Sequence, residues 1–174
     1  MRGGWRILAA AAATLFPVLP AAAQQATPVV PTAERAGIHL PVQLCAMTQE
    51  RLDSSPTGIY AIYRLAGDSS LRIYIGRAAQ SVDGEFNDDE RAISDFFGQV
   101  VMLRDLDPPP GAPEARARAW RGIYAGARVM TGLWLWHHDG ARIKLRGTVP
   151  LGEAARLWPE IECAVRTLTA APLA

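Results

Sequence analysis

The chain has 174 residues, with 18 Lys and Arg, 17 Asp and Glu, and two cysteines. Its formal net charge of +1 excludes the strongly basic composition of proteins that bind nucleic acids or anionic membranes through net charge alone. The length suits one domain with a hydrophobic core.

Residues 1–23 have the pattern of a cleavable secretory signal peptide. Arg2 and Arg6 precede the uncharged apolar residues 7–19, and Ala21-Ala22-Ala23 supplies the small residues that a cut after Ala23 requires. A membrane anchor and a buried N-terminal helix are the alternatives, but two prolines shorten the run below the roughly 20 apolar residues of a span. Because this leader carries two arginines and no acidic residue, its removal changes the formal net charge from +1 to −1. We therefore expect an exported protein, periplasmic or secreted, with no transmembrane segment after cleavage.

The two cysteines, Cys45 and Cys163, lie in the mature part of the chain. An oxidising compartment favours a disulfide between them, and a loop of this length gives a stabilisation of about 4–5 kcal/mol. Two buried free thiols are the alternative. A metal site is not expected, because neither cysteine has a His or a second Cys at ligand spacing.

The first structured segments indicate a β-hairpin. Residues 24–41 contain three prolines and are expected to be an extended lead-in to a single domain at residues 42–170. Residues 42–52 alternate like a strand but could also line a helix. Residues 58–65 and 71–77 are rich in Ile, Tyr and Leu and flank turn residues. If Leu65 faces Leu71, one face of the hairpin is apolar, and the other carries Tyr60, Arg64, Arg72 and Tyr74.

The middle of the chain predicts helices. Asn87 as N-cap and Glu90 at the capping-box position predict a helix over residues 88–106. Its apolar stripe consists of Ile93, Phe96, Phe97, Val100 and Val101. The four prolines of residues 107–113 end it, and residues 114–124 predict a short second helix.

A second hairpin follows, and its turn sets the register. Asp139-Gly140 is typical of a two-residue type I′ turn, so His138 should face Ala141. The same register pairs Trp136 with Ile143 and Trp134 with Leu145. Residues 152–168 then predict a C-terminal helix, which Pro159 either kinks or delays to a start near Trp158.

Together these elements predict an α+β fold. We expect an antiparallel sheet of two hairpins, about four or five strands in all, with the helices packed on one face in the order β-β-α-β-β-α.

The outward face of the second hairpin carries a basic stripe, Arg142, Lys144 and Arg146. With Arg64 and Arg72 it would form one positive patch if the two hairpins adjoin. Such a patch suits an anionic ligand, a lipid head group or an acidic protein partner. The alternative is a solvated outer face that protects against aggregation.

Two tripeptides, Gly58-Ile59-Tyr60 and Tyr74-Ile75-Gly76, resemble the signature of the GIY-YIG endonucleases. That family places the tripeptides on adjacent strands and cuts DNA with the tyrosines, an arginine, a glutamate and a divalent metal. The resemblance implies catalytic roles for Tyr60, Tyr74 and Arg91, with Glu114 or Glu153 as the glutamate. The family's arginine follows the second tripeptide soon after, on a helix, whereas here Arg77 follows at once and Arg91 late.

Other candidate sites have simpler explanations. In His137-His138-Asp139 the two imidazoles diverge on a strand, which favours a turn over a metal site. The acidic residues 88–90 suit a helix start better than calcium. A Gly-x-Ser-x-Gly elbow and a Gly-rich phosphate loop do not occur in the sequence. No cofactor or nucleic-acid partner is therefore expected.

More broadly, the chain is similar to small exported proteins of unknown function that share a Tyr/Ile-rich hairpin, a helix and an Ile-Lys-Leu-Arg strand, here residues 143–146. The sequence predicts an exported, non-enzymatic binding or envelope-associated module, with a GIY-YIG-like nuclease as the alternative.

Overall fold

The structure, a computed structural model, describes Ile38 and residues 40–169. The predicted signal peptide at residues 1–23 and most of the lead-in at residues 24–41 lie outside the described residues.

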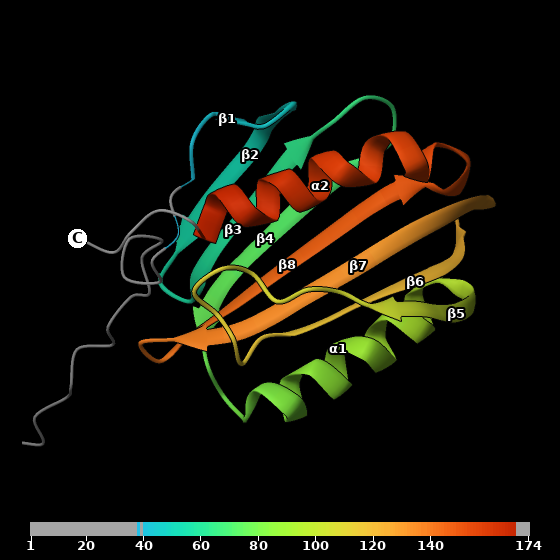
Figure 1. Cartoon of the computed structure of the whole chain (residues 1–174). Helices are drawn as coiled ribbons and strands as arrows, with labels where there is room; N and C mark the ends of the chain where they lie inside the picture. Colours follow the sequence, from blue (N-terminus) through green and yellow to red (C-terminus); the bar gives the residue numbers. More distant parts are fainter. Residues whose placement is uncertain (1–37, 39, 170–174) are drawn as a thin grey trace, which may run out of the picture.

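In the described part of the chain, eight strands form a single antiparallel sheet with two helices (Figure 1). The strands run in the spatial order β1-β2-β3-β4-β8-β7-β6-β5. Their bounds are β1 Gln43–Leu44, β2 Met47–Ser55, β3 Gly58–Arg64, β4 Ser70–Arg77, β5 Gly98–Asp105, β6 Arg116–Tyr124, β7 Ala127–His138 and β8 Ala141–Pro150. Helix α1, Val82–Phe96, connects β4 to β5, and α2, Ala154–Thr169, follows a 3-10 turn at Leu151–Glu153. The predicted α+β class is confirmed. The predicted order β-β-α-β-β-α is wrong, because four strands precede α1 and four more separate it from α2.

The two helices pack on opposite faces of the sheet, so the expectation that they share one face is wrong. Trp134 belongs to the core under α2, whereas its neighbours Leu133 and Leu135 belong to the core under α1. Successive residues of a strand point to opposite faces, and residues 129–136 of β7 are all buried. A strand that is apolar on both sides requires a cover on each.

Helix α2 lies close to the sheet because two glycines make room for it. A Cβ atom on Gly132 would lie 2.5 Å from the Trp158 ring, and one on Gly147 would lie 2.5 Å from Ile161. The Trp158 ring also stacks on Trp134, with 5.8 Å between ring centroids. The approach of the helix therefore depends on bare backbone in β7 and β8.

The two hairpins differ in how well their register was predicted. The pairs of the second hairpin are confirmed, including His138 with Ala141 and Trp134 with Leu145. In the first hairpin Leu71 pairs with Tyr63 instead of Leu65, so the predicted pairing is wrong by two residues. A shift of two leaves every side chain on its predicted face.

The predicted helix at residues 88–106 is wrong at both ends. Helix α1 begins at Val82, where the Ser81 hydroxyl accepts a hydrogen bond from the Gly84 amide, and it ends at Phe96. The chain then turns through Gln99, whose φ is +50°, and continues as strand β5.

The structure also decides three further segments, and at residues 114–124 the predicted helix is wrong. Residues 114–124 contain strand β6 instead of a short helix. Residues 42–52 contain β1 and most of β2, so their alternation indicated strands correctly. Helix α2 begins at Ala154 and holds Pro159 in its interior, so a start near Trp158 is wrong.

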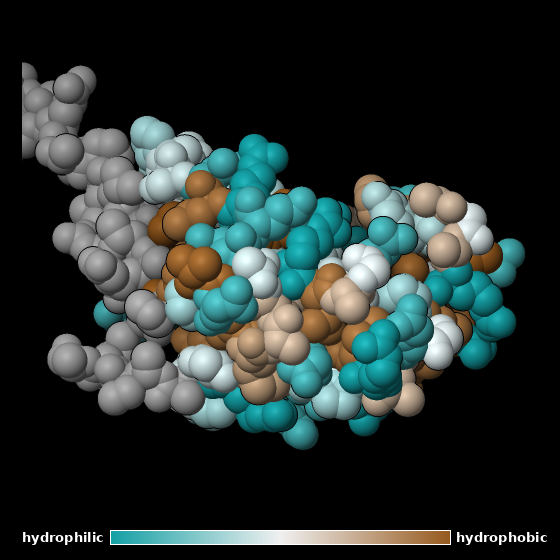
Figure 2. Space-filling view, turned by 90° about the horizontal axis from the view of Figure 1, so that it is seen from above, coloured by the Kyte–Doolittle hydropathy of each residue, from teal (hydrophilic) through white to brown (hydrophobic). Residues whose placement is uncertain are grey.

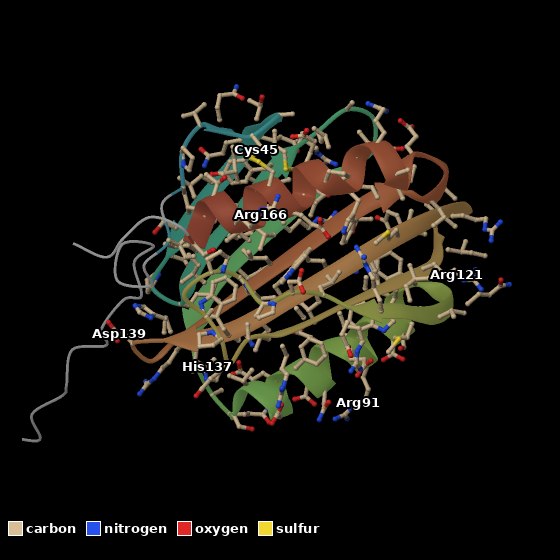
Figure 3. All side chains as sticks on the ribbon, in the orientation of Figure 1. Cys45, Arg91, Arg121, His137, Asp139 and Arg166 are labelled. Carbon is tan, nitrogen blue, oxygen red and sulfur yellow. A yellow bond between two sulfur atoms is a disulfide. The ribbon has the colours of Figure 1, made fainter. Side chains whose placement is uncertain are left out.

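The disulfide between Cys45 and Cys163 is confirmed, with an S–S distance of 2.04 Å. It joins the turn between β1 and β2 to α2, and Figure 3 shows Cys45 beside that helix. Neither helix of the described residues has the length and apolar character that crossing a membrane requires. Figure 2 shows hydrophobic residues scattered among hydrophilic ones on the face seen from above.

Candidate functional site

The two hairpins adjoin, because β4 pairs directly with β8. Helix α1 packs against β5, β6 and β7, on the same side of the sheet as Tyr60, Tyr74 and the basic stripe. We call the side chains that β2, β3, β4 and β8 direct to this side the open face. The open face contains all five arginines and lysines that the sequence singled out, at positions 64, 72, 142, 144 and 146.

Arg72 and Arg146 form the centre of this basic surface. They lie directly opposite each other on β4 and β8, which is a destabilising arrangement for like charges. Among the described residues, neither has a carboxylate within salt-bridge distance. Within the part of the chain that the structure describes, the pair therefore leaves two positive charges without a carboxylate in contact.

The other three cations of the patch are compensated. Arg64 pairs with Glu50. Lys144 Nζ lies 2.8 Å from an Asp89 carboxylate oxygen, and Arg142 Nε lies 3.9 Å from one of Glu85. The positive potential of the open face is thus concentrated at Arg72 and Arg146.

Arg146 is held against two aromatic rings at the end of α1. Its guanidinium carbon lies 5.3 Å from the ring centroid of Phe96 and 4.8 Å from that of Phe97. Burial and the neighbouring Arg72 charge lower the pKa of Arg146, partly opposed by Tyr74 and Asp89. Because this environment disfavours the cation, a bound anion would be stabilised here.

Beside these arginines lies a pair of tyrosines. Tyr60 and Tyr74 are directly paired across β3 and β4, with ring centroids 4.8 Å apart. Lys144 Nζ lies 4.7 Å above the Tyr74 ring, and Arg51 lies over Tyr60. Burial raises the pKa of Tyr74, and Tyr60 raises it further, whereas Arg72 lowers it. The rings offer a flat, uncharged surface next to the cations.

The residues that the GIY-YIG resemblance implies do not all come together. Tyr60 and Tyr74 are neighbours, but Arg91 pairs with Asp88, and Figure 3 shows it on the outer side of α1, away from the sheet. Glu114 lies beside Arg116 in a separate depression, and Glu153 pairs with Arg156. The described residues bring the two tyrosines together without that arginine or either glutamate.

The histidine pair separates as expected for a strand. His137 faces α1, while His138 lies on the other side of β7 beside Asp139. The acidic residues of α1 are used as ion-pair partners, since Asp89 contacts Lys144 and Glu90 contacts Arg118. Within the described residues, no group of three or more His, Cys, Asp and Glu side chains is placed to hold a metal ion.

A buried carboxylate, Glu85, was missed by sequence reasoning. One oxygen accepts hydrogen bonds from the amides of Ala79, at 2.8 Å, and Gln80, at 3.3 Å, and the other lies 2.9 Å from His137 Nε2. Glu85 is 3% exposed. The available signal was Ser81 followed by acidic residues, which marks a helix start six residues before Asn87.

Glu85 should make stability depend on pH. Burial raises its pKa, but the Ala79 amide, His137, the Gln80 amide and the Arg142 charge outweigh burial and leave the pKa below its ordinary value of 4.5. The stabilisation is therefore present above that ordinary value and is lost as pH falls through the lowered folded-state pKa. We expect Glu85→Gln to flatten the fall in unfolding free energy as the pH drops below the ordinary value of 4.5, measured by urea unfolding. Asp68→Asn, in an exposed turn, should keep the native slope, and an unchanged slope in Glu85→Gln would contradict this role.

Comparisons with known proteins give a fold but no family. No family model and no curated protein sequence matches the chain. Among solved structures, the crystal structure of protein PA94 from Pseudomonas aeruginosa, described as a protein of unknown function and a suggested regulator, is similar with a TM-score of 0.52 and 16% sequence identity. The match covers 70% of this chain and 95% of that chain. At this identity the likeness shows a shared fold alone.

Proposed function

We propose that this protein is an exported, non-enzymatic binding module of the bacterial periplasm that holds an anionic ligand on its open face. Its leader pattern and its Cys45–Cys163 disulfide support a location outside the cytoplasm, because disulfides persist in oxidising compartments.

The observation that carries the proposal is the facing pair Arg72 and Arg146. Two opposed guanidinium groups without a carboxylate among the described residues form an arrangement that an anion would stabilise by charge-assisted hydrogen bonds. The guanidinium of Arg146 is already oriented by Phe96 and Phe97, so less side-chain freedom is lost on binding. Tyr60 and Tyr74 supply an adjoining surface for the uncharged part of the ligand.

The test is a binding measurement on the purified mature protein with three anionic probes. These are inorganic phosphate, vesicles containing phosphatidylglycerol, and a short poly-glutamate peptide, which represent a free anion, a lipid head group and an acidic protein. We expect at least one to bind, and Arg72→Gln combined with Arg146→Gln to weaken it about tenfold or more, equivalent to about 1.4 kcal/mol or more.

The control is Arg91→Gln, which removes one positive charge from the outer side of α1 and should leave binding unchanged. Equal binding by the native protein and the Arg72/Arg146 variant for all three probes would refute the proposal. Incubating the protein with plasmid DNA and magnesium or manganese tests the alternative, since cleavage that disappears in Tyr74→Phe would identify a nuclease instead.

A further inference from the structure

A cavity of about 230 Å³ lies at the end of the open face, beyond the tyrosine pair. Its residues come from β2, β3, β4 and β8 and from the turn between β2 and β3. Pockets that enclose drug-sized ligands measure roughly 300–1,000 Å³. A space of this size fits a small molecule, or a small group of a larger one.

The cavity exists because two glycines face each other on neighbouring strands. Gly58 of β3 pairs with Gly76 of β4, and both line the cavity. Adjacent side-chain pairs on this face, such as Tyr60 with Tyr74, are large. The bare backbone at the glycine pair therefore forms a depression whose side wall is made by the tyrosines.

One cation lines this depression without a hydrogen-bond acceptor. Arg142 follows Gly76 across the sheet, on β8, and its guanidinium makes no hydrogen bond to any other described residue. Its buried Nε atom is unsatisfied, because the Glu85 carboxylate is 3.9 Å away, beyond hydrogen-bonding distance. The ion pair with Glu85 holds the inner edge of the guanidinium and leaves its terminal NH2 groups free to donate.

Oxygen-bearing side chains complete the cavity on the β2 side. The hydroxyls of Ser55 and Thr57 and the carboxylate of Asp53 are part of its lining. One oxygen of Asp53 pairs with Arg51 at 2.6 Å. A ligand with two negative charges would be repelled by Asp53, whereas a ligand that donates a hydrogen bond would find acceptors there.

We infer that this cavity is a second binding site, independent of Arg72 and Arg146, for a small monocarboxylic acid that also carries a hydroxyl or ammonium group. The carboxylate binds Arg142 through charge-assisted hydrogen bonds. The hydroxyl or ammonium group donates to Asp53 or to the neighbouring hydroxyls. The carbon skeleton lies over the glycine pair and against the tyrosine rings.

The experiment follows the backbone amide signal of Gly76 by NMR while the mature protein is titrated with lactate, alanine or 4-hydroxybenzoate. At least one acid should shift this signal with a Kd of about 1 mM or lower. Arg142→Gln and Gly76→Leu should each weaken that binding about tenfold or more, the first by removing the cation and the second by filling the cavity. Because the Gly76→Leu variant lacks the Gly76 signal, binding to that variant is followed by the signal of a neighbouring backbone amide.

Three controls separate this site from its surroundings. Gly152→Leu makes the same change where an added Cβ meets open space, and it should leave binding intact. Arg72→Gln should also leave it intact, so that failure of the Arg72–Arg146 proposal and failure of this one give different results. Arg142→Lys keeps the positive charge beside Glu85. If Arg142→Gln loses binding because it disturbs the fold, Arg142→Lys should still bind the acid with part of the native affinity.

The inference is wrong if none of the three acids shifts the Gly76 signal at concentrations up to about 10 mM. A titration to this concentration still detects a binding free energy of about −3 kcal/mol. It is also wrong if binding survives in Gly76→Leu, because the acid would then lie elsewhere. Inorganic phosphate that binds as tightly and with the same dependence on Arg142 would overturn the preference for carboxylates.

Discussion

Replacing Cys45 and Cys163 together by alanine is expected to lower the free energy of unfolding by about 4–5 kcal/mol. The two residues are 118 positions apart, so the bond closes most of the domain into one loop and strongly restricts the unfolded chain. It also anchors β1, a strand of two residues, to helix α2. Urea unfolding of the variant against the oxidised native protein measures the difference.

Chemical reduction of the native protein provides the control, because it breaks the same bond without changing a residue. Reduced native protein and the double-alanine variant should unfold at similar urea concentrations. A difference below about 1 kcal/mol between the oxidised and reduced proteins would show that strain in the folded state offsets most of the loop-closure effect.

The second large effect is expected at Gly58. Its φ is +154°, and an added Cβ would lie 2.3 Å from the carbonyl oxygen of Ile75. Gly58→Ala therefore combines backbone strain with a clash against backbone of β4, and we expect a loss of about 3 kcal/mol or more. Thermal or urea unfolding of the variant measures this loss.

Gly76 is the matched control, since it pairs with Gly58 across the same two strands. A Cβ there would have only an ordinary contact, 3.6 Å from the carbonyl oxygen of Thr57. Gly76→Ala should change stability by less than about 1 kcal/mol. Equal losses in the two variants would mean that the site tolerates neither methyl group, and the geometric distinction between the glycines would fail.

Local turn chemistry explains why one hairpin was predicted correctly and the other was not. Asp139 and Gly140 both have positive φ, +47° and +75°, as a two-residue type I′ turn requires. The first hairpin has no such dipeptide; its loop closes by a hydrogen bond from the Leu65 amide to the Ser69 carbonyl. The alternation of apolar and polar residues predicted which face of this hairpin each side chain lies on. The composition of its loop did not predict how long the loop is.

The errors in the middle of the chain arose from competing periodicities. Val100 and Val101 continue the helical spacing of Ile93 and Phe97, but they lie in strand β5 because the chain turns at Gly98 and Gln99. In β6 the sequence alternates Arg and Ala from position 116, which is a strand pattern. The apolar run at residues 133–136 of β7 did indicate burial on both faces, but it does not show which element covers each face.

The candidate site was predictable only in part. Alternation placed Tyr60, Tyr74 and the basic stripe correctly on one face of the sheet, but α1 packs on that same face and contacts the stripe. Which cations lack a partner depends on tertiary contacts, such as that of Lys144 with Asp89 of α1, and these do not follow from spacing. The cavity required the cross-strand register of Gly58 and Gly76, which the predicted pairing missed by two residues.

Strand β7 links the two hydrophobic cores of the molecule. Its alternate residues contribute to both cores, Trp134 under α2 and Leu133 under α1, and it is hydrogen-bonded to β6 and β8 along its length. Release of either helix exposes one side of β7, while the opposite side of β7 still packs against the remaining helix. We therefore expect loss of packing on one face to weaken the packing on the other, because both cores depend on β7.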